Sequence, residues 1–267
     1  MRRQAACAAA GVLLSFTAGV AEARPLRVLS LDQCADQYVL ALRPDAELAL
    51  SPRADDPDAW LRAAAKGRAR VRPTLEAAVA FQPDVVVRYW GGEPGLLTRL
   101  EARSTSVAVI EDATDFNGIR ANIRSVAEAL DARARGEALI ARMDARLAEA
   151  APTTRQAPTA LYLTAGGFTA GRETLIDAIF RAAGFRNAAD KPYFNPVSVE
   201  RIALSPPVLF VLGFFDQARG DWRGPGRHPV VRKAATGRVA ASLPASTLTC
   251  PAWFAADAAA MLRDDAA

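Results

Sequence analysis

Short runs of apolar residues alternate with helical patterns along the first part of the chain. Four runs have the length and apolar content of buried strands: residues 27–31, 47–50, 85–87 and 107–110. Between these runs, apolar positions recur at helical spacing in residues 36–42 and 74–81. Strands that alternate with helices predict an α/β layer built on a largely parallel sheet.

The middle of the chain has a different pattern. Residues 117–150 contain no proline and only two glycines, Gly118 and Gly136. Four apolar side chains fall at helical spacing between charged residues: Leu139, Ile140, Met143 and Leu147. This pattern predicts a long helical segment with one break near residues 131–136, ending before Pro152.

The α/β pattern resumes after this segment. Strands are predicted at residues 159–163, 208–212 and 239–241, and helices at residues 173–183 and 251–263. The predicted fold class is therefore α/β, with two α/β lobes joined by one long helical rod. The predicted boundaries are residues 24–116 for the first lobe, 117–151 for the linker and 152–267 for the second lobe.

The first 23 residues have the order of a secretory signal peptide. Arg2 and Arg3 precede an apolar run over residues 5–20, and residues 21–23 have the small-x-small pattern of a cleavage site. An uncleaved membrane anchor is the alternative, but the run falls short of the roughly 20 residues that a spanning helix needs. Cys7 lies too early in the run to serve for lipid attachment. We expect cleavage after Ala23 and a protein released into the periplasm.

Charge and composition narrow the class of protein. Cleavage would remove two arginines and one glutamate, which lowers the formal net charge from +4 to +3. This mild charge, with no dense basic stretch among aromatic residues, argues against nucleic-acid binding. The hydrophobic content of 51% is enough for the cores of one large or two modest domains.

Two cysteines, Cys34 and Cys250, would remain after cleavage. A disulfide persists in an oxidising compartment, and a bridge between them would tie the start of the mature chain to its end. The alternative is two separate thiols, one or both lining a ligand site. The sequence leaves both possibilities open.

The sequence displays no catalytic constellation. Its single histidine, His228, lies beside Pro229 in a Gly/Pro-rich loop, and no nucleophile elbow, Walker loop or His-Glu-x-x-His motif occurs. One loop histidine cannot make a zinc or manganese cluster. We therefore expect no enzyme activity, no cofactor and no dedicated metal site, and we expect any bound metal to be held inside an organic chelator.

Aromatic residues follow several predicted strands, where a cleft would open. They are Tyr89 and Trp90 after the third strand, Phe168 after the strand at 159–163, and Phe214, Phe215 and Trp222 after the strand at 208–212. Ligands of α/β sheets bind outside the carboxyl ends of strands, and aromatic faces suit a large, flat or partly apolar ligand. The alternative is that several of these rings only pack loops onto the lobes.

The two halves repeat one feature. Glu76 is followed by a helical stretch, by Pro83 seven residues later and by a strand; Glu200 is followed in the same way by Pro207 and a strand. A glutamate near a helix start is favoured by the helix dipole alone. Two glutamates at equivalent places in two lobes suggest a shared task.

Five stretches of the chain are informative together: residues 28–37 (VLSLDQCADQ), 75–87, 174–187 and 199–207, and the Cys250-Pro251 pair. They resemble the helical-backbone (class III) periplasmic binding proteins of ATP-binding-cassette (ABC) importers, which serve cobalamin, haem and ferric siderophores. The order and spacing of these stretches carry the resemblance, which runs from about Arg27 to the C-terminal helix.

The resemblance implies two lobes on a rigid long helix, a ligand cleft between them and little opening or closing. Glu76 and Glu200 match the lobe-surface glutamates that engage arginines of the importer's membrane permease, and such rim charges steer docking. Residues 31–36 and the Cys250-Pro251 pair look most like the cobalamin branch, in which some members have a disulfide. Arg53 and Arg88 would face an anionic chelate or be ordinary solvated charges.

The function expected from the sequence is therefore capture of a metal chelate, with a corrinoid such as cobalamin first, then a ferric siderophore or haem. The expected ligand-binding residues are Cys34, Arg53, Tyr89, Trp90, Phe168, Phe215 and Trp222. Proteins of this kind usually work as monomers. The alternatives are an exported sensory or scaffold domain and, with less support, a hydrolase.

Overall fold

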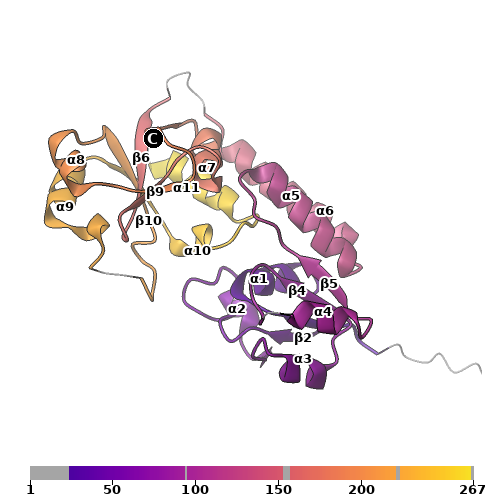
Figure 1. Ribbon diagram of the computed structural model, residues 1–267. Helices are drawn as coiled ribbons and strands as arrows, with labels where there is room; N and C mark the ends of the chain where they lie inside the picture. Colours follow the sequence, from indigo (N-terminus) through magenta and orange to yellow (C-terminus); the bar gives the residue numbers. More distant parts are fainter. Residues whose placement is uncertain (1–23, 94, 153–156, 221–222, 266–267) are drawn as a thin grey trace, which may run out of the picture.

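The computed structural model describes residues 24–93, 95–152, 157–220 and 223–265, which form two α/β lobes connected by a pair of helices (Figure 1). The signal peptide expected at residues 1–23 lies outside these residues. Among the described residues, no helix combines the length and the apolar character that crossing a membrane requires.

The N-terminal lobe is a parallel five-stranded sheet in the order β3-β2-β1-β4-β5. Its strands are β1 (Arg27–Ser30), β2 (Glu47–Leu50), β3 (Ala69–Arg70), β4 (Val85–Arg88) and β5 (Ser106–Val109). Its helices are α1 (Gln33–Leu42), α2 (Arg62–Ala65), α3 (Leu75–Phe81) and α4 (Leu96–Glu101). Val86 packs with Leu96 and Leu100 of α4 on one face of the sheet, while Val85 and Val87 join the main core on the other face. Burial on both faces explains why β4 is a continuous apolar run.

The C-terminal lobe is a parallel four-stranded sheet in the order β11-β10-β6-β8, beside a small antiparallel pair, β7 and β9. The strands are β6 (Thr159–Thr164), β7 (Phe168–Ala170), β8 (Arg186–Asn187), β9 (Phe194–Pro196), β10 (Leu209–Gly213) and β11 (Val239–Leu243). The helices are α7 (Leu175–Ala182), α8 (Val199–Leu204), α9 (Pro229–Ala235), α10 (Ala245–Leu248) and α11 (Ala255–Asp265), with a short 3₁₀ turn at Pro225–Arg227. Helices α8 and α9 lie on one side of this sheet, and α7 and α11 on the other (Figure 1).

The helical linker is an antiparallel hairpin of α5 (Phe116–Ala129) and α6 (Arg133–Ala150). Its two helices are paired by the ion pairs Arg120–Asp144, Arg124–Glu137 and Glu128–Arg133. The predicted break is confirmed, but the chain reverses there, so the single rod expected from the pattern is replaced by two packed helices. Gly136 permits their close approach, because a Cβ atom at this position would lie 2.6 Å from the Ala127 Cβ.

One continuous hydrophobic core joins the lobes. Buried side chains of β1, α1 and β4 belong to the same cluster as those of α5, α6, α7 and α11. Tyr38 of α1 packs edge-on against Trp253, which follows β11, and Trp60 stacks on Phe254. The lobes are therefore fixed to each other by a packed joint as well as by the chain connection.

Candidate functional site

The carboxyl ends of the two sheets meet in space. After β10, the Ala218 backbone N–H donates to Asp58 Oδ1 at 3.3 Å, and Arg219 Nη2 lies 3.4 Å from Asp56 Oδ1. Both aspartates lie in the loop that follows β2. After β11, the chain reaches Cys250, which is bonded to Cys34 just after β1. Loops at the carboxyl ends of both sheets thus contact each other, where ligands of parallel sheets bind.

The joint beside these loops contains the disulfide. Cys34 and Cys250 are bridged with a Cα–Cα distance of 5.4 Å, both nearly buried. Beside the bridge, the Tyr38 hydroxyl donates to the Pro251 carbonyl oxygen at 2.7 Å. The structure therefore has the disulfide, not two free thiols. Because the Cys34 sulfur is bonded to Cys250, it cannot bind a ligand as a thiol.

Asp32 organises the loops of the N-terminal lobe. Its Oδ1 atom accepts from the backbone N–H groups of Cys34 and Ala35, which caps α1. Its Oδ2 atom accepts from the N–H groups of Tyr89, Trp90 and Gly91, at 2.7, 3.1 and 2.9 Å. Gly91 is required for this close approach, because a Cβ there would lie 2.3 Å from the Leu31 carbonyl oxygen. One buried carboxylate thus fixes the loop that carries the predicted aromatic ligands.

Asp36 ties α1 to the end of β2. Its carboxylate accepts from the Ser51 N–H at 2.9 Å and from the Ser51 hydroxyl at 2.6 Å. Burial raises the pKa of Asp36 to about 7, against the lowering effect of these hydrogen bonds. The position of the loop after β2 therefore depends on a carboxyl group that titrates near neutral pH.

The predicted aromatic pair lies at the carboxyl end of β4. Trp90 is 58% exposed. Tyr89 is partly buried and donates its hydroxyl proton to Asp112; burial, then this hydrogen bond, raises the pKa of Tyr89. At the end of the same strand, the Arg88 Nε atom is buried with no hydrogen-bond partner among the described residues. This strand end therefore carries an exposed ring, a phenol and a buried guanidinium nitrogen without a partner.

Arg53 follows β2 and already has a partner. Its Nε atom lies 2.8 Å from Asp56 Oδ2, while the other Asp56 oxygen faces Arg219 of the opposite lobe. Asp56 thereby links two arginines from two lobes. Arg53 thus lies in one of the facing loops, where a ligand-binding role predicts it. Its guanidinium already pairs with the Asp56 carboxylate.

The C-terminal lobe contributes Phe168 and Phe215 at the carboxyl ends of β6 and β10. Phe168 is 47% exposed at the start of β7. The Arg227 guanidinium lies 5.0 Å from the centre of the Phe215 ring and donates to the Phe215 carbonyl oxygen at 2.6 Å. This contact holds the loop after β10 in place. Trp222, the remaining predicted ligand residue, lies outside the described residues.

Glu76 and Glu200 occupy the same position in two short helices of different lobes. Each is the second residue of its helix, α3 or α8, and each helix is capped by a hydroxyl, that of Thr74 or Ser198. Both glutamates are exposed. The Ser198 hydroxyl also donates to Glu200 Oε2 at 2.7 Å, and this bond lowers the pKa of Glu200. Each lobe therefore presents one carboxylate at a capped helix start.

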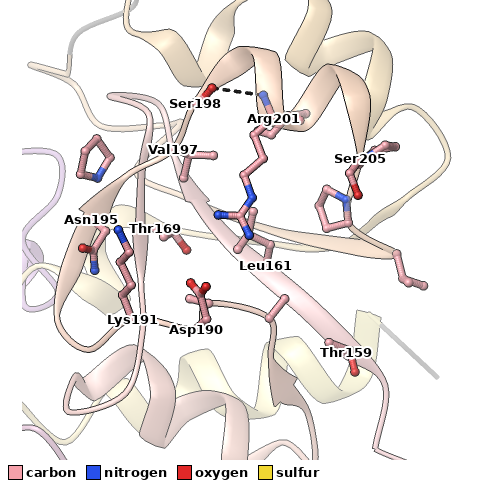
Figure 2. Close-up of a pocket in the computed structure, with 17 residues that line it drawn as sticks. Thr159, Leu161, Thr169, Asp190, Lys191, Asn195, Val197, Ser198, Arg201 and Ser205 are labelled. Carbon is pink, nitrogen blue, oxygen red and sulfur yellow. Dashed lines mark hydrogen bonds between the residues drawn. The ribbon is translucent and has the colours of Figure 1, made fainter.

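No group of three or more His, Cys, Asp or Glu side chains in the described parts of the chain is arranged to hold a metal ion. A cavity of about 450 Å³ lies in the C-terminal lobe, lined by Thr159 at the amino end of β6 and by Val208 just before β10 (Figure 2). None of its lining residues belongs to the facing loops after β2 and β10, so the cavity is separate from them.

The fold and this site define a two-lobed binding protein. Residues 34–221 match the family described as periplasmic binding protein, and the chain belongs to that family. A cobalamin-binding protein of Halobacterium salinarum is 30% identical over 209 residues, which cover 74% of this chain and 57% of that relative. The chain thus spans little more than half the length of this relative.

Solved structures agree with the family. The periplasmic haem-binding protein BhuT, in complex with two haems, has 26% identity and a TM-score of 0.66, over 90% of this chain and 99% of that one. The haem-binding protein RhuT of Roseiflexus sp. RS-1, solved in apo form, has 23% identity and a TM-score of 0.69, over 91% of this chain and 100% of that one. The second likeness bears on the fold alone.

Sequence reasoning missed the contacts that position the site. Asp32 could have been found, because an aspartate directly between a strand and a helix is a helix-capping signal. Nothing in the sequence indicates that Asp32 also binds the loop after β4. The Asp56–Arg219 and Asp58–Ala218 contacts cross between lobes and have no local signal.

Proposed function

We propose that this chain is the periplasmic substrate-binding component of an ABC importer, which captures a metal chelate between its lobes. The main support is that loops at the carboxyl ends of the two parallel sheets contact each other, next to the disulfide that links the lobes. Such loops are the usual ligand site of open α/β sheets, and membership of the periplasmic binding protein family supports the same reading.

A corrinoid is the first proposed ligand, with a ferric siderophore or haem next. The likeness to a cobalamin-binding protein supports the corrinoid, and the likeness to BhuT supports haem. Trp90 and Phe168 offer exposed ring faces to a large, flat ligand. The guanidinium groups of Arg53 and of the partly exposed Arg88 would pair with acidic groups of the chelate.

Docking on the permease is assigned to Glu76 and Glu200. They lie on different lobes at matching helix positions, so one permease pair could engage both carboxylates at once. The Ser198 hydroxyl keeps Glu200 ionised by lowering its pKa. Exposed charges of this kind mainly steer association and set its register.

Ligand capture is tested by a tryptophan-fluorescence titration of the protein with cobalamin, cobinamide, haemin and ferric siderophores, corrected for ligand absorbance. We expect saturable quenching by one class, and about tenfold weaker binding in Trp90→Ala. Phe194→Ala is the matched control, since Phe194 is an equally exposed ring at the far end of β9. Absence of a response to every ligand would reject the chelate assignment.

Docking is tested separately in a transport assay with the cognate permease. Glu76→Lys combined with Glu200→Lys should abolish uptake and leave the ligand affinity unchanged, because neither residue lies at the strand ends. Glu101→Lys combined with Asp264→Lys makes the same charge change on exposed helix positions, one in each lobe, and should transport normally. Normal uptake by the first pair would remove the docking role without affecting the ligand assignment.

A further inference from the structure

The cavity in the C-terminal lobe has the size of a small-molecule site. It lies between α8 and the sheet, with the loop between β8 and β9 as a third wall (Figure 2). Its volume of about 450 Å³ falls within the range of roughly 300–1,000 Å³ that small-molecule sites occupy.

The wall of the cavity is mainly apolar. Leu161 of β6, Val197 and Ile202 of α8 line it, and the same side chains belong to the hydrophobic cluster that packs α8 and α9 on the sheet. The cavity therefore adjoins the hydrophobic core beneath α8 and α9, and its apolar wall would accept the hydrocarbon part of a ligand.

Thr169 supplies an unsatisfied polar group to this wall. It is only 7% exposed, and its hydroxyl has no hydrogen-bond partner among the described residues. Thr169 belongs to β7, directly opposite Asn195 of β9, and both residues line the cavity. Buried hydroxyls nearly always have a partner, so this hydroxyl points to one that the protein itself does not provide.

The charged groups of the cavity favour an anion. The Arg201 side chain extends from α8 into the cavity, and Lys191 and Asp190 lie on the opposite wall (Figure 2). The Arg201 backbone N–H donates to Ser198 Oγ, whereas its guanidinium forms no ion pair with a described carboxylate. Two cationic side chains and one carboxylate leave the cavity with a net positive charge.

We propose that this cavity is a second binding site, which takes a small amphipathic carboxylate. Arg201 and Lys191 pair with the carboxylate, Thr169 donates a hydrogen bond to the ligand, and the hydrocarbon body lies along Leu161, Val197 and Ile202. The site is distinct from the one proposed for the chelate between the lobes, because none of its lining residues is assigned to the chelate.

The test uses decanoate as the probe and ¹H–¹⁵N correlation spectra of the purified protein as the readout. We expect saturable shifts at the amides of Thr169, Asn195 and Arg201. Arg201→Gln should raise the decanoate dissociation constant about tenfold, the effect of losing one good charge-assisted hydrogen bond, and leave that of 1-decanol unchanged. Arg99→Gln, which makes the same charge change on exposed α4, is the matched control.

Thr169→Val separates a ligand role from a merely structural one. The isosteric change removes the unpartnered hydroxyl, so the free protein should melt at a higher temperature while decanoate binds a few-fold more weakly. Unchanged decanoate binding in both Thr169→Val and Arg201→Gln overturns the proposal. Shifts that do not saturate, or that centre on Trp90 and Phe215, overturn it as well.

Discussion

Asp32 and Asp36 are four residues apart in the chain. Both accept hydrogen bonds through a buried carboxylate, but they fix different parts of the N-terminal lobe. Asp32 accepts five backbone N–H groups, two from the first turn of α1 and three from the loop after β4. Asp36 accepts both the N–H and the hydroxyl of Ser51. Both carboxylates are buried, so their hydrogen bonds hold loops that local chain preferences alone would leave free.

Asp32→Asn should lower the free energy of unfolding by about 3 kcal/mol, because the new amide group faces N–H donors and leaves at least one of them unsatisfied. Trp90 emission should also change, since its loop loses its anchor. Asp115→Asn is the matched control: Asp115 caps α5 through Gly118 alone, and asparagine caps as well as aspartate. Urea unfolding measures all three proteins, and an equal loss in the two variants would contradict the role given to Asp32.

Asp36 makes stability depend on pH. Its pKa is about 7 in the folded protein and near 3.8 when unperturbed, so the folded state holds a proton that the unfolded state releases between these values. The stabilisation that protonated Asp36 gives the folded state is therefore fully present below about pH 4. It is lost as the pH rises through 7, which lowers the free energy of unfolding by up to about 4 kcal/mol.

Asp36→Asn imitates the protonated side chain and should flatten the pH dependence of the melting temperature between pH 4 and 8, relative to the unaltered protein. Ser51→Ala removes a hydrogen bond that lowers the pKa of Asp36 and should move the transition to higher pH. Parallel pH curves for the unaltered protein and Asp36→Asn would refute this assignment.

At the scale of elements, the joint between α1 and the segment after β11 is the most constrained part of the molecule. The disulfide joins two residues that are 216 positions apart in the sequence. Beside it, the Tyr38 hydroxyl donates to the Pro251 carbonyl oxygen and the Tyr38 ring packs against Trp253. The same constraint explains why the last helix begins at Ala255 instead of residue 251, as the pattern predicted: the four residues between are packed into the joint.

Cys34→Ser combined with Cys250→Ser should lower the free energy of unfolding by about 4 kcal/mol, since the unfolded chain loses a long cross-link. The protein should stay folded, because the aromatic contacts of the joint remain. Urea curves with and without a reducing agent measure this, and the double variant should not respond to the reductant. A loss below about 1 kcal/mol would show that the joint is held by packing alone.

At the scale of the molecule, three kinds of contact hold the lobes together. The continuous core, the disulfide and the contacts of Asp56 and Asp58 with residues 218 and 219 all cross between them. Hinge motion needs a few residues that can absorb a change of backbone angles, and a packed joint resists it.

Ligand binding should therefore leave the relative placement of the lobes almost unchanged. Small-angle X-ray scattering of the free and the ligand-saturated protein should give the same radius of gyration within error. The double cysteine variant provides the comparison, because a looser joint permits closure. A clear contraction of the unaltered protein on binding would contradict a fixed joint.

The alternation of apolar and polar residues determined much of the fold on its own. It placed β2 at Glu47–Leu50 and located the break in the helical linker, because burial of one face or both leaves a local periodicity. It missed α4, α9 and the β7–β9 pair, which are short and whose formation depends on neighbouring elements. For the site, the order of strands and aromatics was sufficient to place Trp90 and Phe168 at strand ends.

Only the tertiary structure decided which residues distant in the sequence contact each other. The pairing of Cys34 with Cys250, the reversal between α5 and α6 and the binding of the Tyr89–Gly91 loop by Asp32 all join residues that are not neighbours in local pattern. The sequence determined the long helices and strands because each depends on the spacing of apolar residues within its own segment. Contacts between distant residues depend on how all elements pack together, and no local period records that arrangement.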